Sequence, residues 1–173
     1  AGGEGQRAKQ KIPKQFIYLS NKEYPPHRLL YNQYGYIGQS DGNFRFDEVI
    51  TVVHKNWIKE IQKELEDWNN TINKIVSGGS SRTESSYIGL KACSKECKNV
   101  LIHDSARPFA GKKIFDDCLD YLESFDSVVP IITHKDTTLL KNNGTIKYLN
   151  RATLKLIQTP QAFKYNLIRK AYD

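Results

Sequence analysis

The sequence predicts an α/β fold in which helices cover both faces of a doubly wound, mostly parallel sheet. Short apolar runs alternate with longer amphipathic runs along the chain, and strands that alternate with helices favour a parallel sheet. The runs predicted as strands are continuous and β-branched, as in strands buried on both faces. With 173 residues, 39% hydrophobic and 26% charged, the chain has the size and composition of a single domain spanning 1–173.

The predicted elements follow one another in a regular order. The predicted strands are Glu48–His54, Ile72–Val76, Asn99–His103 and Ser127–Thr133. The predicted helices are Trp57–Trp68, Ser85–Ala92 and Lys113–Ser124, the first of which has apolar residues at helical spacing. Sheets of this kind bind ligands outside the carboxyl ends of their strands, so the loops that follow the strands are where functional residues are expected.

Two segments interrupt this alternation. Residues 25–43 are rich in Tyr, Gly and Asn and contain Pro25-Pro26, which predicts an irregular insertion. Thr137–Leu149 carries Asn143-Gly144 between two short runs with β-branched residues, a strong signal for a tight hairpin. A hairpin inserted into an α/β chain projects from the body, where it either decorates the surface or contacts another subunit.

The charge and the cysteines limit the classes of function. The net charge of +7 is compatible with nucleic-acid binding, but the lysines are scattered along the chain, and a basic surface also suits triphosphates and sugar phosphates. We therefore favour small phosphorylated ligands over nucleic acid. Cys93, Cys97 and Cys118 lack the partners of a zinc set and are expected to be free thiols. No apolar stretch approaches the roughly 20 residues of a membrane-spanning helix.

The start of the chain carries the first candidate site. Gly2, Gly3 and Gly5 allow a backbone turn whose N–H groups approach a triphosphate. Arg7 and Lys14, the latter within Pro13-Lys14-Gln15, add positive charge for phosphate oxygens. Taken alone, the segment could equally be a flexible glycine-rich terminus.

The second candidate site is Gly78–Ser85, between a predicted strand and a predicted helix. Exposed backbone N–H groups at the start of a helix could read the edge of a base there, and Ser85 could add a hydroxyl. The alternative is a glycine turn in which Ser81 or Ser85 caps the helix.

The third candidate site, His103–Phe109, directly follows a predicted buried strand. Asp104 at the end of that strand is well placed to hold Mg²⁺, which prefers oxygen ligands and bridges them to phosphate. Arg107 could bind a second phosphate. The alternative is an Asp–Arg pair that only holds the loop together.

The fourth candidate site consists of Arg151 and the segment Gln158-Thr159-Pro160-Gln161. This segment is not a general chemical motif. By itself it predicts the end of a strand and a turn before a helix around Leu167–Tyr172.

In this order, the motifs resemble those of the methylerythritol 4-phosphate cytidylyltransferases of the non-mevalonate isoprenoid pathway. The matching segments are A-G-G-E-G-Q-R-A, P-K-Q, G-G-S-S-R-T-E-S-S, H-D-S-A-R-P-F, D-T, R and T-P-Q-A-F. The resemblance extends from Ala1 to Asp173, except for 25–43. It implies a Rossmann-like nucleotidyltransferase that joins CTP to 2-C-methyl-D-erythritol 4-phosphate, giving 4-diphosphocytidyl-2-C-methyl-D-erythritol and pyrophosphate.

The resemblance also implies roles for individual residues. Arg7 and Lys14 would be catalytic, stabilising charge on the α-phosphate. The residues implied to bind the nucleotide are Gly2, Gly3, Gly5, Gly79, Ser80, Ser85 and Asp104. Asp104 would also hold Mg²⁺. The residues implied to bind the second substrate are Arg107, Thr137, Arg151 and Thr159.

The predicted hairpin forms an arm at about 133–153, which in the family reaches the site of another subunit. A homodimer is therefore expected, without a membrane partner. Relative to the family, the chain begins inside the nucleotide loop and ends before the last strands, so it is expected to be incomplete at both ends. Gly2, Ala8 and Ser105 depart from the family motifs.

Two other functions and two locations remain open. Ribitol 5-phosphate cytidylyltransferases and other sugar-phosphate nucleotidyltransferases share the fold, and a non-catalytic phosphate- or RNA-binding module is an alternative of a different class. The lysine-, asparagine- and isoleucine-rich composition predicts a plastid, apicoplast-like, of a eukaryotic parasite. A bacterial cytoplasm is the alternative.

Overall fold

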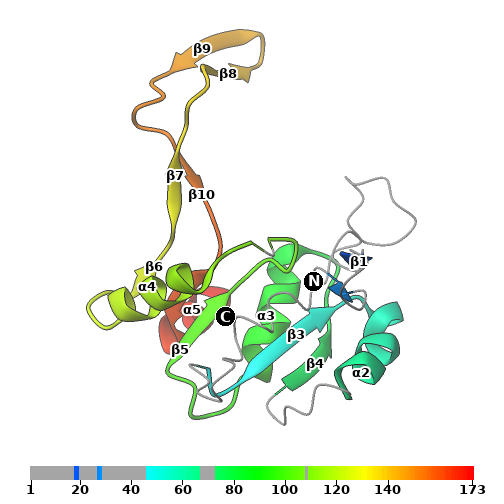
Figure 1. Cartoon of the computed structure of the whole chain (residues 1–173). Coiled ribbons are helices and arrows are strands. Elements are labelled where there is room, and N and C mark those ends of the chain that lie inside the picture. Colours follow the sequence, from blue (N-terminus) through cyan, green and yellow to red (C-terminus); the bar gives the residue numbers. More distant parts are fainter. Residues whose placement is uncertain (1–17, 20–26, 29–45, 67–72, 108) are drawn as a thin grey trace.

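A computed structural model (Figure 1) describes residues 18–19, 27–28, 46–66, 73–107 and 109–173. The glycine-rich start, with Gly2, Gly3, Gly5, Arg7 and Lys14, lies outside the described residues. So does the predicted insertion at 25–43 apart from residues 27–28, which form strand β2 (His27–Arg28) antiparallel to β1 (Tyr18–Leu19).

The first half of the fold is a strand–helix–strand–helix unit. Strand β3 (Val49–Val53) pairs in parallel with β4 (Asn73–Ser77), in register from Val49 opposite Asn73 to Val53 opposite Ser77. The connection contains the short helix η3 (Lys55–Trp57) and α2 (Ile58–Glu66), and α3 (Arg82–Ala92) follows β4. These elements confirm the predicted α/β alternation.

The second half contains a strand that is not predicted from the sequence. Strand β11 (Gln161–Lys164) lies between β5 (Asn99–Ile102) and β6 (Ser127–Val128) and is antiparallel to both. Strands β5 and β6 consequently run in the same direction, as expected of strands joined through the helix α4 (Lys112–Leu122). Helix α5 (Tyr165–Tyr172) follows β11 directly.

A small apolar core joins this sheet to its helix. Cys118 and Leu122 of α4 and Ala162 of β11 are buried together, with Leu101 and Val128 packed against them. Because Ala162 and Leu122 are fully buried, this core fixes β11, and the loop before it, against β5.

The predicted strand Ser127–Thr133 is broken into two strands that join different partners. Strand β6 ends at Val128, and β7 (Ile131–Thr133) pairs instead with β10 (Lys155–Ile157). Pro130 lies between them; proline has no N–H to give to a ladder and is rarely found inside a central strand. The break sends the chain out of the body of the molecule.

The predicted arm is present and projects from the body (Figure 1). Strands β7 and β10 form its stem, and β8 (Thr138–Asn142) and β9 (Thr145–Leu149) form the outer hairpin. Asn143 and Gly144 have positive φ values of 44° and 80°, as a tight hairpin turn between right-handed twisted strands requires.

Candidate functional site

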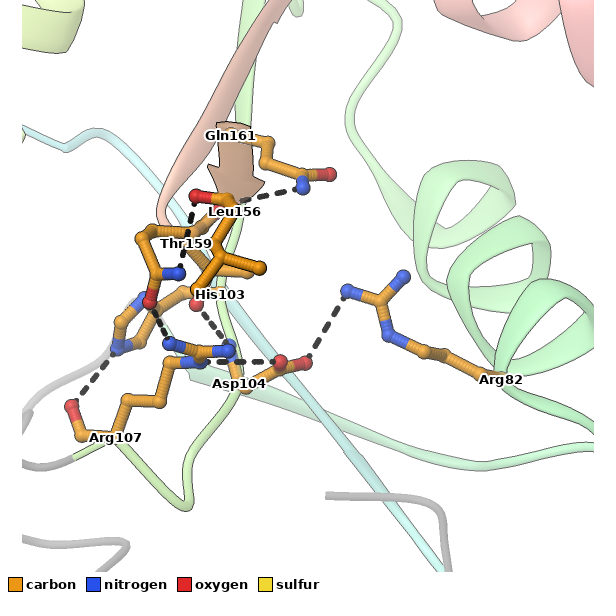
Figure 2. A network of polar contacts seen from close by, with 8 residues as sticks. Arg82, His103, Asp104, Arg107, Leu156, Thr159 and Gln161 are labelled. Atoms are coloured by element: carbon orange, nitrogen blue, oxygen red, sulfur yellow. Dashed lines mark hydrogen bonds and ion pairs between the residues drawn. The ribbon is translucent and has the colours of Figure 1, made fainter. Parts of the chain in front are cut away.

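The loops after β4 and β5 are joined by an ion pair. Strand β4 ends at Ser77 and β5 at Ile102, so the second and third candidate motifs both begin at carboxyl ends of strands. The guanidinium of Arg82, at the first turn of α3, lies with Nη2 3.3 Å from Oδ1 of Asp104 (Figure 2). The two motifs therefore belong to one site.

The loop before α3 is held by side chains of the helix that follows it. Gly79 N–H donates to Oγ of Ser85 at 3.1 Å, and the N–H and Oγ of Ser80 both donate to Oε2 of Glu84 at 2.7 Å. The cap of the helix is Ser81, whose Oγ accepts the N–H of Glu84 at 3.0 Å. Helix α3 thus begins at Arg82 rather than at Ser85 as predicted, and the Ser85 hydroxyl belongs to the loop.

The carboxylate of Asp104 lies between two guanidinium groups (Figure 2). Arg82 contacts Oδ1, and Nε of Arg107 lies 3.6 Å from Oδ2. On its other side, Arg107 donates from Nη1 to Oε1 of Gln158. The Asp–Arg pair proposed as a purely structural alternative is therefore formed, but it lies in a partly open position, with 39% of the Asp104 side chain exposed.

The segment Gln158–Gln161 holds the Asp104 loop in place through hydrogen bonds to Asp104 and Arg107. Thr159 is 5% exposed, and its Oγ1 accepts the N–H of Asp104 at 3.2 Å. Gln161 donates from Nε2 to the carbonyl of Gln158 at 3.1 Å, which fixes the turn from which the side chain of Gln158 meets Arg107. In this structure the hydroxyl of Thr159 holds the backbone of Asp104, and its predicted contact with substrate stays a prediction.

His103 belongs to the same loop as a structural residue. Its ring packs edge-on to Phe115, with centroids 5.1 Å apart, and its Nε2 lies 3.3 Å from the carbonyl oxygen of Arg107. Since a carbonyl only accepts, we assign the proton to Nε2. Burial lowers the pKa of His103 below its ordinary value of 6.5, although the bond to the Arg107 carbonyl opposes this effect. His103 is consequently neutral at pH 7.

The predicted residues on the arm lie apart from this loop. Thr137 precedes β8 and Arg151 follows β9, so both lie beyond the stem (Figure 1). Both are exposed, and Arg151 donates from Nη1 to the carbonyl of Lys135 at 3.2 Å. Within one chain the structure therefore does not bring Thr137 and Arg151 to Asp104. The predicted residues that it does bring to this region are Gly79, Ser80, Ser85, Asp104, Arg107 and Thr159.

Three residues of the site lie within the predicted segments but were given no role from the sequence. They are Arg82, Glu84 and Gln158, which bind Asp104, Ser80 and Arg107 respectively. Arg82 offered a usable signal, because a cation at the first position of a helix faces the positive end of the helix dipole and needs another partner. Glu84 offered another: a glutamate three residues after a serine cap commonly reaches back to the preceding backbone.

The described residues limit how a metal ion could be held. Among them, no group of three or more His, Cys, Asp or Glu side chains could hold a metal. Mg²⁺ is commonly bound through one or two carboxylates together with substrate phosphates. Asp104 can serve as such a single carboxylate ligand if Arg82 or Arg107 moves away from the Asp104 oxygen that it contacts.

Comparisons with known proteins agree on one family. The profile of "IspD: 2-C-methyl-D-erythritol 4-phosphate cytidylyltransferase" matches residues 1–173. A protein of that name from Clostridium perfringens (strain ATCC 13124) is 36% identical over 176 residues, which cover 100% of this chain and 74% of the relative. The crystal structure of the enzyme of the same name from Francisella tularensis is 25% identical with a TM-score of 0.75, covering 100% of this chain and 73% of that chain. The 4-diphosphocytidyl-2C-methyl-D-erythritol synthase of Anaerococcus prevotii is 28% identical with a TM-score of 0.75, covering 84% of this chain and 66% of that chain.

Proposed function

Because the chain belongs to the 2-C-methyl-D-erythritol 4-phosphate cytidylyltransferase family, we propose how its residues carry out that reaction. The protein is a nucleotidyltransferase that transfers a cytidylyl group from CTP to 2-C-methyl-D-erythritol 4-phosphate in isoprenoid precursor biosynthesis. The products are 4-diphosphocytidyl-2-C-methyl-D-erythritol and pyrophosphate.

The chemical step is an in-line displacement at the α-phosphorus of CTP. An oxygen of the methylerythritol phosphate forms a bond to the α-phosphorus, and the bond from that phosphorus to the bridging oxygen of pyrophosphate breaks. The attacking phosphate is already ionised, so no general base is required. Catalysis consists of positioning and of stabilising negative charge. This agrees with a structural role for His103, whose ring packs against Phe115 and whose Nε2 is bonded to the carbonyl of Arg107.

The nucleotide is assigned to two loops. We propose that Gly2, Gly3 and Gly5 shape the backbone around the triphosphate, and that Arg7 and Lys14 stabilise its charge; these residues lie outside the described part of the chain. The cytosine is assigned to the loop of Gly79, Ser80 and Ser85. What supports this second assignment is the fixed backbone of that loop and its link, through Arg82, to Asp104.

The single observation that carries the active-site proposal is the paired arrangement of Asp104 and Arg107. Arg107 is held between Asp104 and Gln158, and we propose that its guanidinium binds a second phosphate there. We propose that Asp104 faces the ribose side of the nucleotide and is the protein ligand of Mg²⁺. When bound, Mg²⁺ would neutralise phosphate charge. If the ion took the place of Arg82 or Arg107 at the Asp104 carboxylate, the displaced guanidinium would be free to bind a phosphate.

A homodimer through the arm is the second part of the proposal. The outer hairpin exposes Leu139, Leu140, Ile146 and Tyr148, with exposed fractions between 49% and 72%. Apolar side chains clustered on a projecting element are typical of a contact surface. In a dimer, Thr137 and Arg151 would bind the phosphate of methylerythritol in the site of the partner, where they could meet Arg107. A site shared between subunits would account for the position of Thr137 and Arg151 beyond the stem of the arm.

The third part of the proposal is the location of the protein in the cell. No helix in the described part of the chain is long and apolar enough to cross a membrane. The relatives reported above come from bacteria, which supports the bacterial cytoplasm over the predicted plastid. We propose the bacterial cytoplasm.

Pyrophosphate release tests the assignment of substrate and site together. With CTP and Mg²⁺, the purified protein should turn over methylerythritol 4-phosphate in preference to ribitol 5-phosphate, and Lys14→Ala should abolish turnover. A preference for ribitol 5-phosphate would move the protein to another pathway with the same mechanism. A folded protein without turnover on either substrate, but with salt-sensitive RNA binding, would support the binding-module alternative.

A further inference from the structure

Glu84 occupies the donors of the loop that is assigned to cytosine. The N–H and the Oγ of Ser80 both donate to the same oxygen, Oε2, at 2.7 Å. These two bonds lower the pKa of Glu84, with the hydroxyl of Ser80 as the largest cause, so the carboxylate is ionised at pH 7. Ser80 therefore has neither its N–H nor its hydroxyl free for a base while Glu84 stays in place.

The side chain of Glu84 also packs closely against Gly79. A Cβ added at Gly79 would overlap Cγ and Cδ of Glu84, so the side chain of Glu84 lies directly over the α-carbon of Gly79. The φ angle of Gly79 is not in the left-handed region, so the backbone itself would accept alanine. What requires glycine here is the position of Glu84.

The hydroxyl of Ser85 is available for the base. The oxygen of Ser85 accepts the N–H of Gly79 at 3.1 Å, and a serine hydroxyl can accept and donate at once. No acceptor for its hydrogen is found among the residues that the structure describes. A donor that is itself accepting a hydrogen bond is polarised and strengthened by it. Cytosine offers ring acceptors of the kind that this hydroxyl can bind.

We infer that Glu84 is a positioning residue for nucleotide selection, which fixes the Gly79–Ser80 backbone so that the Ser85 hydroxyl meets the base. The inference rests on the proposed assignment of this loop to cytosine. It gives Glu84 no contact with the reacting atoms; Glu84 acts through Ser80 and Gly79.

The test separates positioning from charge. Because one oxygen accepts both bonds, the amide oxygen of Glu84→Gln can replace it, whereas Glu84→Ala cannot. We expect Glu84→Ala to raise the KM for CTP about fivefold, the scale of a lost hydrogen-bonded contact, and to lower the preference for CTP over UTP. The kcat and the KM for methylerythritol 4-phosphate should change by less than about twofold, since the site of Asp104 is untouched. Glu84→Gln should restore most of the affinity for CTP.

A double-mutant cycle tests the contact with Gly79. Gly79→Ala should raise the KM for CTP as Glu84→Ala does, because the new methyl displaces the carboxylate. In the Glu84→Ala background the same substitution should have little further effect. Additive effects of the two substitutions would contradict the inference. Glu123→Ala, which removes an exposed carboxylate beyond α4, is the matched control and should leave both constants unchanged.

Ser85→Ala separates failure of this inference from failure of the cytosine assignment. If Ser85→Ala leaves CTP binding unchanged by calorimetry, the base does not bind this loop, and the assignment and the inference fall together. If Ser85→Ala weakens CTP binding but Glu84→Ala does not, only the inference is wrong. The inference would also be overturned if Glu84→Gln raised the KM for CTP as much as Glu84→Ala does. The charge of Glu84, rather than its hydrogen bonds to Ser80, would then be responsible for the effect.

Discussion

Replacing Asp104 by asparagine tests whether its carboxylate serves the reaction or only the loop. The substitution keeps the size of the side chain and the backbone N–H that donates to Thr159. It removes the negative charge that lies 3.3 Å from Arg82 and 3.6 Å from Arg107. The asparagine oxygen can still accept from one of the two guanidinium groups.

The expected effect on stability is small. At these separations each pair is worth about 1 kcal/mol by Coulomb's law in water. Pairs whose side chains are 39% to 62% exposed contribute about 0.2–1 kcal/mol each after screening and side-chain entropy. The loss in the free energy of unfolding should therefore be about 1 kcal/mol, which lowers the Tm by roughly 2–4 °C for a domain of this size.

The expected effect on activity is much larger. If the carboxylate holds the ion and the ribose, its loss should lower kcat/KM by about 100-fold, and a factor of that size corresponds to about 2.7 kcal/mol of transition-state stabilisation. The Mg²⁺ concentration for half-maximal rate should rise, because a neutral amide is a weaker ligand than a carboxylate.

The assay combines urea unfolding with pyrophosphate release across a Mg²⁺ titration. Asp117→Asn is the control, because it breaks the exposed ion pair with Lys113 on α4 and should leave turnover unchanged. Turnover by Asp104→Asn within about threefold of the parent protein, with the same Mg²⁺ dependence, would refute the catalytic assignment. Asp104 would then serve only to hold its loop.

Four further predictions concern stability, assembly and the sharing of the site. Because the pKa of His103 is lowered in the folded protein, the unfolded chain binds more protons as the pH falls below 6.5. The free energy of unfolding should therefore be full above that pH and fall as the pH drops through the folded pKa. In urea unfolding, the stability of His103→Gln should depend less on pH. Leu122→Ala, in the fully buried core, should lower the free energy of unfolding by about 3 kcal/mol, whereas a loss below about 1 kcal/mol in thermal unfolding would show a core that collapses around the gap. Ile146→Asp on the exposed arm should yield monomers in sedimentation with an intact melt. Mixed Arg151→Ala and Asp104→Asn proteins should recover turnover that neither has alone, and no recovery would contradict a site shared between subunits.

Much of the fold could be predicted because its signals are local. The β-branched run at Val49–Val53 and the helical spacing of Ile58 and Ile61 lie within single elements. Asn143-Gly144 specified the arm hairpin, because these residues tolerate the positive φ that the turn requires. Such preferences act over a few residues and can be recognised without a partner.

The strand Gln161–Lys164 could not be predicted in the same way. Its four residues, Q-A-F-K, show neither clear alternation nor a β-branched run, and pairing with both β5 and β6 makes it a strand. Pro130 was visible in the sequence, but the change of partner from β11 to β10 across it depends on segments far along the chain.

The sequence by itself determined the family motifs and the residue types of the site, and only the tertiary structure decided which of them meet. The Asp104 loop could be assigned from its position after a strand, but its pairing with Arg82 and the burial of Thr159 behind it join residues distant in sequence. The same holds for the arm: Thr137 precedes β8 and Arg151 follows β9, so both lie beyond its stem and away from that loop. The physical reason is that charge and hydrogen-bonding capacity belong to a residue, whereas a contact depends on how the whole chain packs.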